Sequence, residues 1–201
     1  MKIFKLLGDL IILSILWVIG SLPIITIGAS THAIMSVCEN KIRKKETNII
    51  NDFFQSYKKD FFKSLKSTLI IMTIWFATLN YALSVISNLS EGFNFNVIIL
   101  LIALFETVMI SLYLCGLNSK YHLGSLGTLK NAIIFVHAYF KESVQAFTLI
   151  SAALFVTASV PFFIIILPGA VAMIASGFLN LSIEKYKERL SILNEIKKNG
   201  Y

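Results

Sequence analysis

Long apolar runs alternate with short polar segments along the whole chain. The stretch 10–38 contains 29 residues without Asp, Glu, Lys or Arg, and the stretch 143–183 contains 41. A helix that crosses the hydrocarbon core of a bilayer needs about 20 mainly apolar residues. Each run is therefore long enough for two spans joined by a turn. The first turn is expected at Pro23, because proline disfavours the interior of a helix, and the second between Pro161 and Gly169.

The pattern predicts an all-α protein, a polytopic transmembrane helical bundle of six spans in a single membrane domain over 1–201. The predicted spans cover residues 3–21, 23–44, 67–87, 97–117, 143–161 and 168–186. Connectors then occupy 45–66 and 118–142. A five-span alternative treats 10–27 as one span and leaves Lys2 and Lys5 on the opposite side.

Composition and charge support a membrane protein and orient it. Hydrophobic residues make up 56% of the chain and charged residues 14%, whereas soluble domains carry about 25% charged residues. In the six-span interpretation, all 18 Lys and Arg residues lie on one side of the membrane, at the start of the first span, in 39–66, in 118–142 and in the tail from residue 184. The excess of positive charge on cytoplasmic loops therefore predicts that both termini are cytoplasmic. The net charge of +7 does not indicate nucleic-acid binding, because no groove-reading motif accompanies it.

The first connector carries an aromatic and basic pattern. Phe54, Tyr57 and Phe61 recur at helical spacing, which predicts an amphipathic helix in the membrane interface. The alternative is a cytoplasmic extension of the next span. The second connector repeats the pattern more weakly around His137. The residues predicted to contact the interface or a partner are Phe53, Phe54, Tyr57, Lys58 and Phe61.

Glu106 lies near the middle of the predicted span 97–117. A carboxylate at that depth is costly, so such residues face a partner or a water-filled cavity. One interpretation is a proton or cation relay, or a polar contact to a solute. The other is a protonated side chain hydrogen-bonded to a neighbour such as Asn80, Ser84 or Thr26.

Small and hydroxyl-bearing residues cluster after Pro23. At the start of a helix, free amides attract anions, but small residues also let helices pack closely. His32 is predicted to be a hydrogen-bonded interior residue rather than a ligand. The candidate intramembrane polar site comprises Glu106, Asn80, Thr26, Ser30, Thr31 and His32. With no nucleophile elbow, phosphate loop, zinc motif or paired acids, the sequence predicts neither an enzyme, a cofactor nor a metal site.

Four segments of the chain resemble a known family. They are residues 9–13 (DLIIL) with Trp17, 21–31 (SLPIITIGAST), 52–58 (DFFQSYK) and 129–132 (LKNA). Together they resemble the YesL-like family of bacterial integral membrane proteins, a domain of unknown function. The resemblance implies location in the cytoplasmic (inner) membrane of a bacterium, and genes beside those for ATP-driven carbohydrate permeases.

These expectations lead to two hypotheses of function. The first is a non-catalytic accessory component of carbohydrate uptake. It would dock a sugar permease of the ABC type, or self-associate, through small-residue helix faces and the aromatic–basic connector. The second is a small secondary transporter or channel with Glu106 on its pathway.

Overall fold

A computed structural model describes residues 2–43, 48–88, 95–121 and 124–199, and over these residues the chain is helical and contains no strand. About 93% of it is helix. The elements are α1 (Lys2–Gly20), η1 (Ile24–Thr26), α2 (Ile27–Ile42), α3 (Ile49–Lys59), α4 (Phe61–Ser87), α5 (Phe95–Lys120), α6 (Ser125–Ala138), α7 (Phe140–Ser159), η3 (Pro161–Ile165) and α8 (Leu167–Asn199). The turn expected between the predicted spans 67–87 and 97–117 lies mostly outside the described residues, as do positions 122–123 of the second connector.

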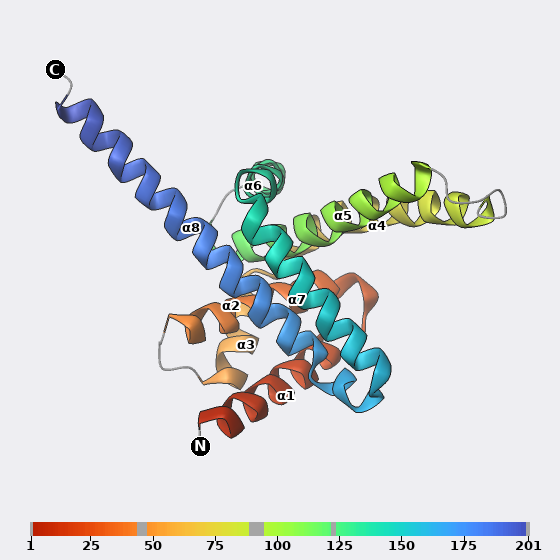
Figure 1. Ribbon diagram of the computed structural model, residues 1–201. Helices are drawn as coiled ribbons and strands as arrows, with labels where there is room; N and C mark the ends of the chain where they lie inside the picture. The colour runs from red at the N-terminus through yellow and green to blue at the C-terminus, as the bar shows by residue number, and fades with distance from the viewer. Residues whose placement is uncertain (1, 44–47, 89–94, 122–123, 200–201) are drawn as a thin grey trace.

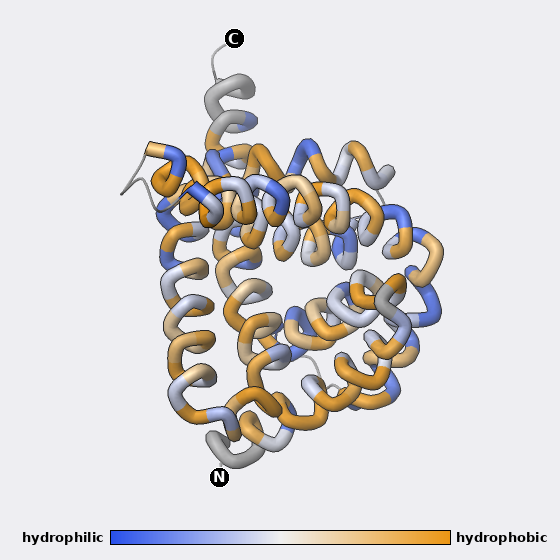
Figure 2. The backbone as a smooth tube through the Cα atoms, turned by 90° about the vertical axis from the view of Figure 1, so that its right-hand side faces the viewer, coloured by the Kyte–Doolittle hydropathy of each residue, from blue (hydrophilic) through white to orange (hydrophobic). Residues whose placement is uncertain are grey.

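Four of the described helices, α4, α5, α7 and α8, are long and apolar enough to cross a membrane. Their outer surfaces carry many exposed apolar side chains, such as Phe76 at 71% and Phe155 at 75% exposure. Figure 2 shows hydrophobic residues along most of the length of the helices, as a protein with lipid as its solvent requires. The chain is therefore a helical membrane protein. Among the described residues, α1 contributes the shorter apolar stretch Leu6–Gly20, and α2 has only 16 residues, so the predicted count of six spans is not confirmed.

Helix α2 is the core of the molecule. It contacts α1, α3, α4, α5 and α8, and ten of its 16 residues are buried. At 1.5 Å per residue its length is about 24 Å, which is short for a span. The predicted helix 23–44 is corrected accordingly. The amide of Thr26 bonds the carbonyl of Pro23 at 2.8 Å, so a 3-10 turn precedes the α-helix.

Two antiparallel pairs extend from this core. The hairpin of α4 and α5 points away from the other helices, and α7 lies beside α8, whose C-terminal part projects from the body (Figure 1). Helix α1 crosses the beginning of α8 rather than running alongside it. Gly169 lies against Leu10 and Ser14, in the middle of α1. The two helices therefore come closest where the middle of α1 meets the start of α8.

Both predicted connectors are largely helical, and the long helix that follows each of them begins before the predicted end of the connector. Helix α3 is followed by a break at Asp60, so α4 begins at Phe61, inside the predicted connector. Helix α6 is likewise followed by a break at Tyr139 before α7. Asp60 is both the last cap of α3 and the first cap of α4, and Tyr139 has the same two roles for α6 and α7. Each connector therefore contains one helix, which is followed directly by the next long helix.

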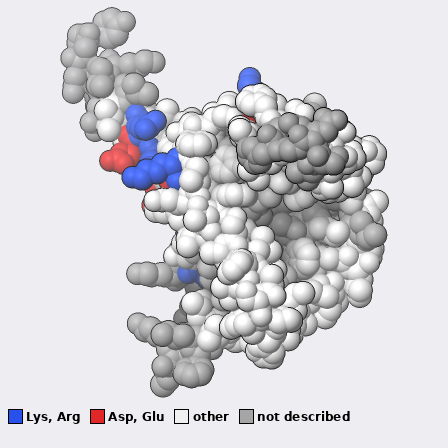
Figure 3. Space-filling view, turned by 45° about the vertical axis from the view of Figure 1, so that its right-hand side comes forward, with Lys and Arg blue, Asp and Glu red and all other residues white. Residues whose placement is uncertain are grey.

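Charges gather at one end of the molecule. Figure 3 shows Lys, Arg, Asp and Glu side chains beside the base of the projecting part of α8, and a broad uncharged surface over much of the rest of that face. Ion pairs at this end join the helices. Lys41 of α2 pairs with Asp9 of α1, and Lys185 of α8 pairs with Glu142 of α7.

Candidate functional site

The cluster predicted after Pro23 closes the turn between α1 and α2. The hydroxyl of Thr26 lies 2.7 Å from the carbonyls of Gly20 and Pro23. The hydroxyl of Thr31 donates to the carbonyl of Ile27 and accepts a hydrogen bond from the indole N–H of Trp17 at 3.0 Å. Both hydroxyl groups are thus used within the protein, and the arrangement favours helix packing over an anion site.

Replacing Thr26 by valine is expected to destabilise the fold, because two carbonyl oxygens lose a buried hydroxyl donor. The expected cost in unfolding free energy is about 1–3 kcal/mol. Thr148 provides the matched control, since its exposed hydroxyl bonds only the carbonyl of Val144 one turn earlier. Thermal unfolding in detergent, followed by circular dichroism, should show a lower midpoint for Thr26→Val. Equal midpoints for Thr26→Val and Thr148→Val would contradict this role.

His32 is buried, at 2% exposure. Neither of its ring nitrogens meets a hydrogen-bond partner among the described residues, and the same holds for the hydroxyl of Ser30. The prediction of an interior histidine agrees with this position, and its predicted hydrogen bond stays a prediction, with the backbone of Asn118 as a hydrogen-bonding group near the ring. Ser30 lies at the crossing of α1 and α2, where a Cβ on Gly20 would come within 2.5 Å of its hydroxyl.

A polar node next to His32 joins α2, α4 and α5. The backbone of Asn118 faces the His32 ring. The side-chain amide of Asn118 donates to the hydroxyl of Ser67 at 2.9 Å, and its backbone carbonyl accepts from the ammonium of Lys63 at 2.8 Å. The Lys63 ammonium also bonds the carbonyl of Tyr121 at 2.7 Å. Lys63 thus caps the C-terminal end of α5, where carbonyls lack partners within the helix.

A second node joins α2, α5 and α8 at the charged end of the body. The ammonium of Lys120, only 7% exposed, lies 3.1 Å from the Glu39 carboxylate and also contacts the side-chain oxygen of Asn180. Arg43 approaches the same carboxylate at 2.9 Å from the more exposed side. Neither Glu39 nor Lys120 was among the predicted site residues. No sequence signal links them, since they are 81 positions apart.

Glu106 faces outward instead of into the body. Its carboxylate lies 3.3 Å from the Nε2 atom of His137, and the two side chains are 42% and 56% exposed. Helix α6 packs along α5, which brings His137 level with Glu106. The expected partners of Glu106 are therefore corrected: Asn80 bonds the carbonyl of Phe76 in its own helix, and Thr26 bonds the α1–α2 turn.

The second ring nitrogen of His137 is held within its own helix. The Nδ1 atom lies 2.9 Å from the carbonyl oxygen of Ile133, which can only accept, so Nδ1 carries a hydrogen. This contact orients the ring so that Nε2 faces the Glu106 carboxylate.

The aromatic–basic connector is divided between the core and the surface. Phe53 is 1% exposed and packs in the core formed around α2, so it is not available to a partner. Tyr57 stacks on Phe53 and its hydroxyl donates to the carbonyl of Gly20 at 3.3 Å. Phe54 and Lys58 are exposed, and Phe61 begins α4. The aromatic residues are thus divided within α3 itself, because the adjacent Phe53 and Phe54 lie on different sides of the helix, whereas Tyr57 and Phe61 stay in contact across the break at Asp60, with ring centroids 5.7 Å apart.

Part of the chain is similar to a known protein family. A family described as "Protein of unknown function, DUF624" matches residues 10–81, which is somewhat over a third of the chain. The matched part runs from α1 through most of α4 and includes the whole of α2. No curated protein and no solved structure matches the chain.

Proposed function

We propose that this protein is a non-catalytic accessory component of carbohydrate uptake, and that it docks a sugar permease in the cytoplasmic membrane of a bacterium. The resemblance to YesL-like proteins motivates the choice of partner. The observation that supports docking is the outward-facing pair of Glu106 and His137 on the α5–α6 surface. Polar groups inside a bilayer usually face a protein partner rather than lipid.

The surroundings of this pair suit a transmembrane helix of a partner. The outer face of α5 exposes Ile102 at 54%, and α6 exposes Ile134 at 49%. Glu106 is 11 residues from the start of α5 and 14 from its end, so it lies near the middle of the helix. A partner helix on this face would cover the pair and could donate a hydrogen bond to the carboxylate, as polar side chains do between membrane helices.

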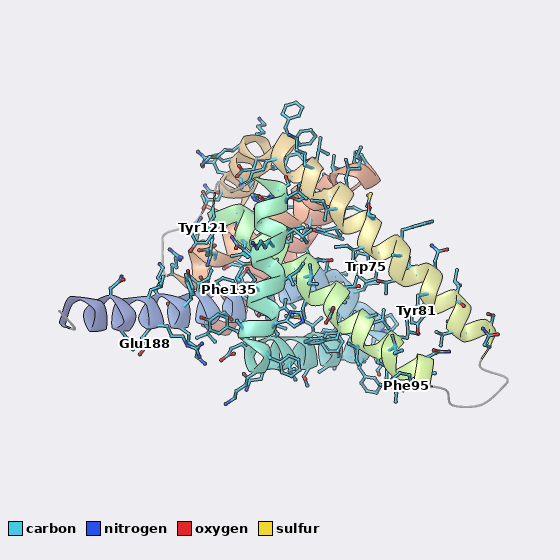
Figure 4. All side chains as sticks on the ribbon, turned by 90° about the horizontal axis from the view of Figure 1, so that it is seen from above. Trp75, Tyr81, Phe95, Tyr121, Phe135 and Glu188 are labelled. Carbon is cyan, nitrogen blue, oxygen red and sulfur yellow. The ribbon has the colours of Figure 1, made fainter. Side chains whose placement is uncertain are left out.

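The small-residue faces that were also expected to dock the partner are used inside the chain. A Cβ on Gly28 would lie 1.8 Å from the hydroxyl of Thr68, and a Cβ on Gly116 would lie 2.4 Å from Leu179. These glycines permit close contacts of α2 with α4 and of α5 with α8. The docking surface is therefore assigned to the projecting α4–α5 hairpin and to α6. Figure 4 shows Tyr81 and Phe95 at the far end of that hairpin.

A double variant tests this surface without leaving an unpaired charge. Replacing Glu106 and His137 together by leucine is expected to weaken permease binding by about 1–2 kcal/mol, a roughly 5–30-fold loss. The measurement is the amount of permease subunits that co-purify with the tagged protein in mild detergent. Gln145→Leu is the matched control, because Gln145 is an exposed polar residue on α7, outside the α4–α5 hairpin and α6.

Two outcomes would count against the proposal in different ways. Unchanged co-purification with the double variant would show that the permease binds another surface. Absence of permease from the wild-type preparation, with sugar uptake unchanged on gene deletion, would reject the accessory role. The alternative, a small transporter that uses Glu106, instead predicts a solute flux in vesicles that Glu106→Gln abolishes.

A further inference from the structure

Two cavities of about 340 and 450 Å³ lie next to each other among the helices. The smaller lies mainly between α2, α4 and α5, and the larger between α1, α2 and α8. Three residues, Thr31, Leu112 and Val171, line both cavities, so the two adjoin, and we refer to them together as the inner chamber. Trp75 lines the smaller part and Trp17 the larger, and these are the two tryptophans of the chain. Figure 4 shows Trp75 on α4.

The hydroxyl groups that line the inner chamber already have partners in the protein. Thr31 bonds the carbonyl of Ile27, Thr68 bonds the carbonyl of Ser64 at 2.8 Å, and Ser111 bonds the carbonyl of Thr107 at 2.6 Å. The indole N–H of Trp17 donates to Thr31. A sugar or an ion would lose its water here without gaining equivalent hydrogen bonds, and that loss is costly. The lining therefore favours a hydrocarbon.

The rim of the chamber lies on the apolar outer surface. Val18 of α1, Ile27 of α2 and Ile164 of η3 line the cavities and are exposed at 52%, 36% and 63%. In a membrane these side chains contact lipid tails rather than water. The chamber is thus open to the hydrocarbon around the protein, and a tail can enter without crossing a polar boundary.

We propose that the inner chamber binds an acyl chain of a membrane phospholipid. An unfilled space of this size would deprive its lining of van der Waals contacts. At about 30 Å³ for each methylene, which is the volume of a water molecule in the liquid, either part holds roughly ten or more methylenes. The chain would rest against Leu112 and Val171, between the two indole rings. This binding is independent of the proposed docking of a permease, which uses the other face of α5.

The two tryptophans make the proposal measurable in the intact protein. The protein is reconstituted into vesicles of phosphatidylcholine with brominated acyl chains, which quench indole fluorescence, and is then exchanged into excess unbrominated detergent. Lipids at the outer surface are lost, whereas a chain held in the chamber stays. We expect residual quenching of Trp17 in Trp75→Phe and of Trp75 in Trp17→Phe, with one phospholipid retained per protein by native mass spectrometry.

A filling substitution separates the chamber from other lipid sites. Val171→Phe places a larger side chain at the shared wall and should abolish both the residual quenching and the retained lipid. Leu112→Phe is the second variant in case the first does not fold, as judged by circular dichroism and gel filtration. Val144→Phe, on the exposed surface of α7, should leave both signals unchanged. Complete recovery of fluorescence in the wild type, or retention of lipid by both folded filling variants, would overturn the proposal.

Discussion

Replacing Glu39 by leucine is expected to cost about 3–5 kcal/mol of unfolding free energy, because it leaves the Lys120 ammonium buried without a carboxylate. The lysine side chain is 7% exposed, so water cannot replace the lost partner. Its remaining contact is the neutral side-chain oxygen of Asn180. The change should appear as a large drop in the thermal midpoint in detergent, together with loss of monodisperse protein.

The double variant Glu39→Leu/Lys120→Met tests whether the unpaired Lys120 ammonium causes the loss of stability in Glu39→Leu. Replacing both members of a buried pair by apolar residues is often close to neutral, so most of the stability should return. Arg43→Gln is the control, since Arg43 approaches the same carboxylate from a side chain that is 46% exposed. An exposed pair of this kind contributes about 0–1 kcal/mol. A double variant as unstable as Glu39→Leu would contradict the assignment.

Two glycines of the same helix are expected to respond in opposite ways to substitution by alanine. A Cβ on Gly169 would lie 2.7 Å from the backbone carbonyl oxygen of Leu10 and 2.9 Å from the hydroxyl of Ser14. Since a backbone atom cannot rotate away, Gly169→Ala should force α1 and α8 apart. The expected loss is about 1–3 kcal/mol, as for other overpacked sites.

Gly177 lies two turns further along α8, and a Cβ added there would meet nothing within 4 Å. Gly177→Ala should therefore be neutral or stabilise the helix by about 0.5–1 kcal/mol. The comparison requires only thermal midpoints of the two variants in the same detergent. Midpoints that fall equally for both would show that the close crossing of α1 and α8 does not limit stability.

The pattern of apolar residues was sufficient to predict the helical fold class and the four long apolar helices. Those helices bury their backbone polar groups within themselves, so composition and length alone identify them. The same pattern was not sufficient to predict how α1 and α2 pack against the other helices. The run around Pro23 contains enough apolar residues for two spans, but the close approach of Gly28 to α4 and of Gly169 to α1 depends on residues far apart in the sequence, such as Gly28 with Thr68 and Gly169 with Ser14. Periodicity within one segment carries no information about such crossings.

The candidate site was also predictable only in part, because local sequence patterns identify unusual residues but not their partners in the fold. Glu106 was identified because a carboxylate inside an apolar run is unusual. Its partner was not, because the pairing with His137 depends on how α6 folds back along α5. The polar residues after Pro23 were found from their clustering, but only the structure shows that Thr26 and Thr31 bond backbone carbonyls. Asn118 and Lys120 have no distinguishing local pattern.

The crossing of the first and last helices has a consequence for biosynthesis. Helix α2 is enclosed by segments that include α8, and Leu10 and Ser14 of α1 contact Gly169. Because the ribosome makes these parts in order, the contacts of α1 and α2 with α8 can form only after the segment that begins at Leu167 has been made. A chain terminated before residue 167 would present a short, polar-lined helix to lipid, and quality-control proteases should remove it.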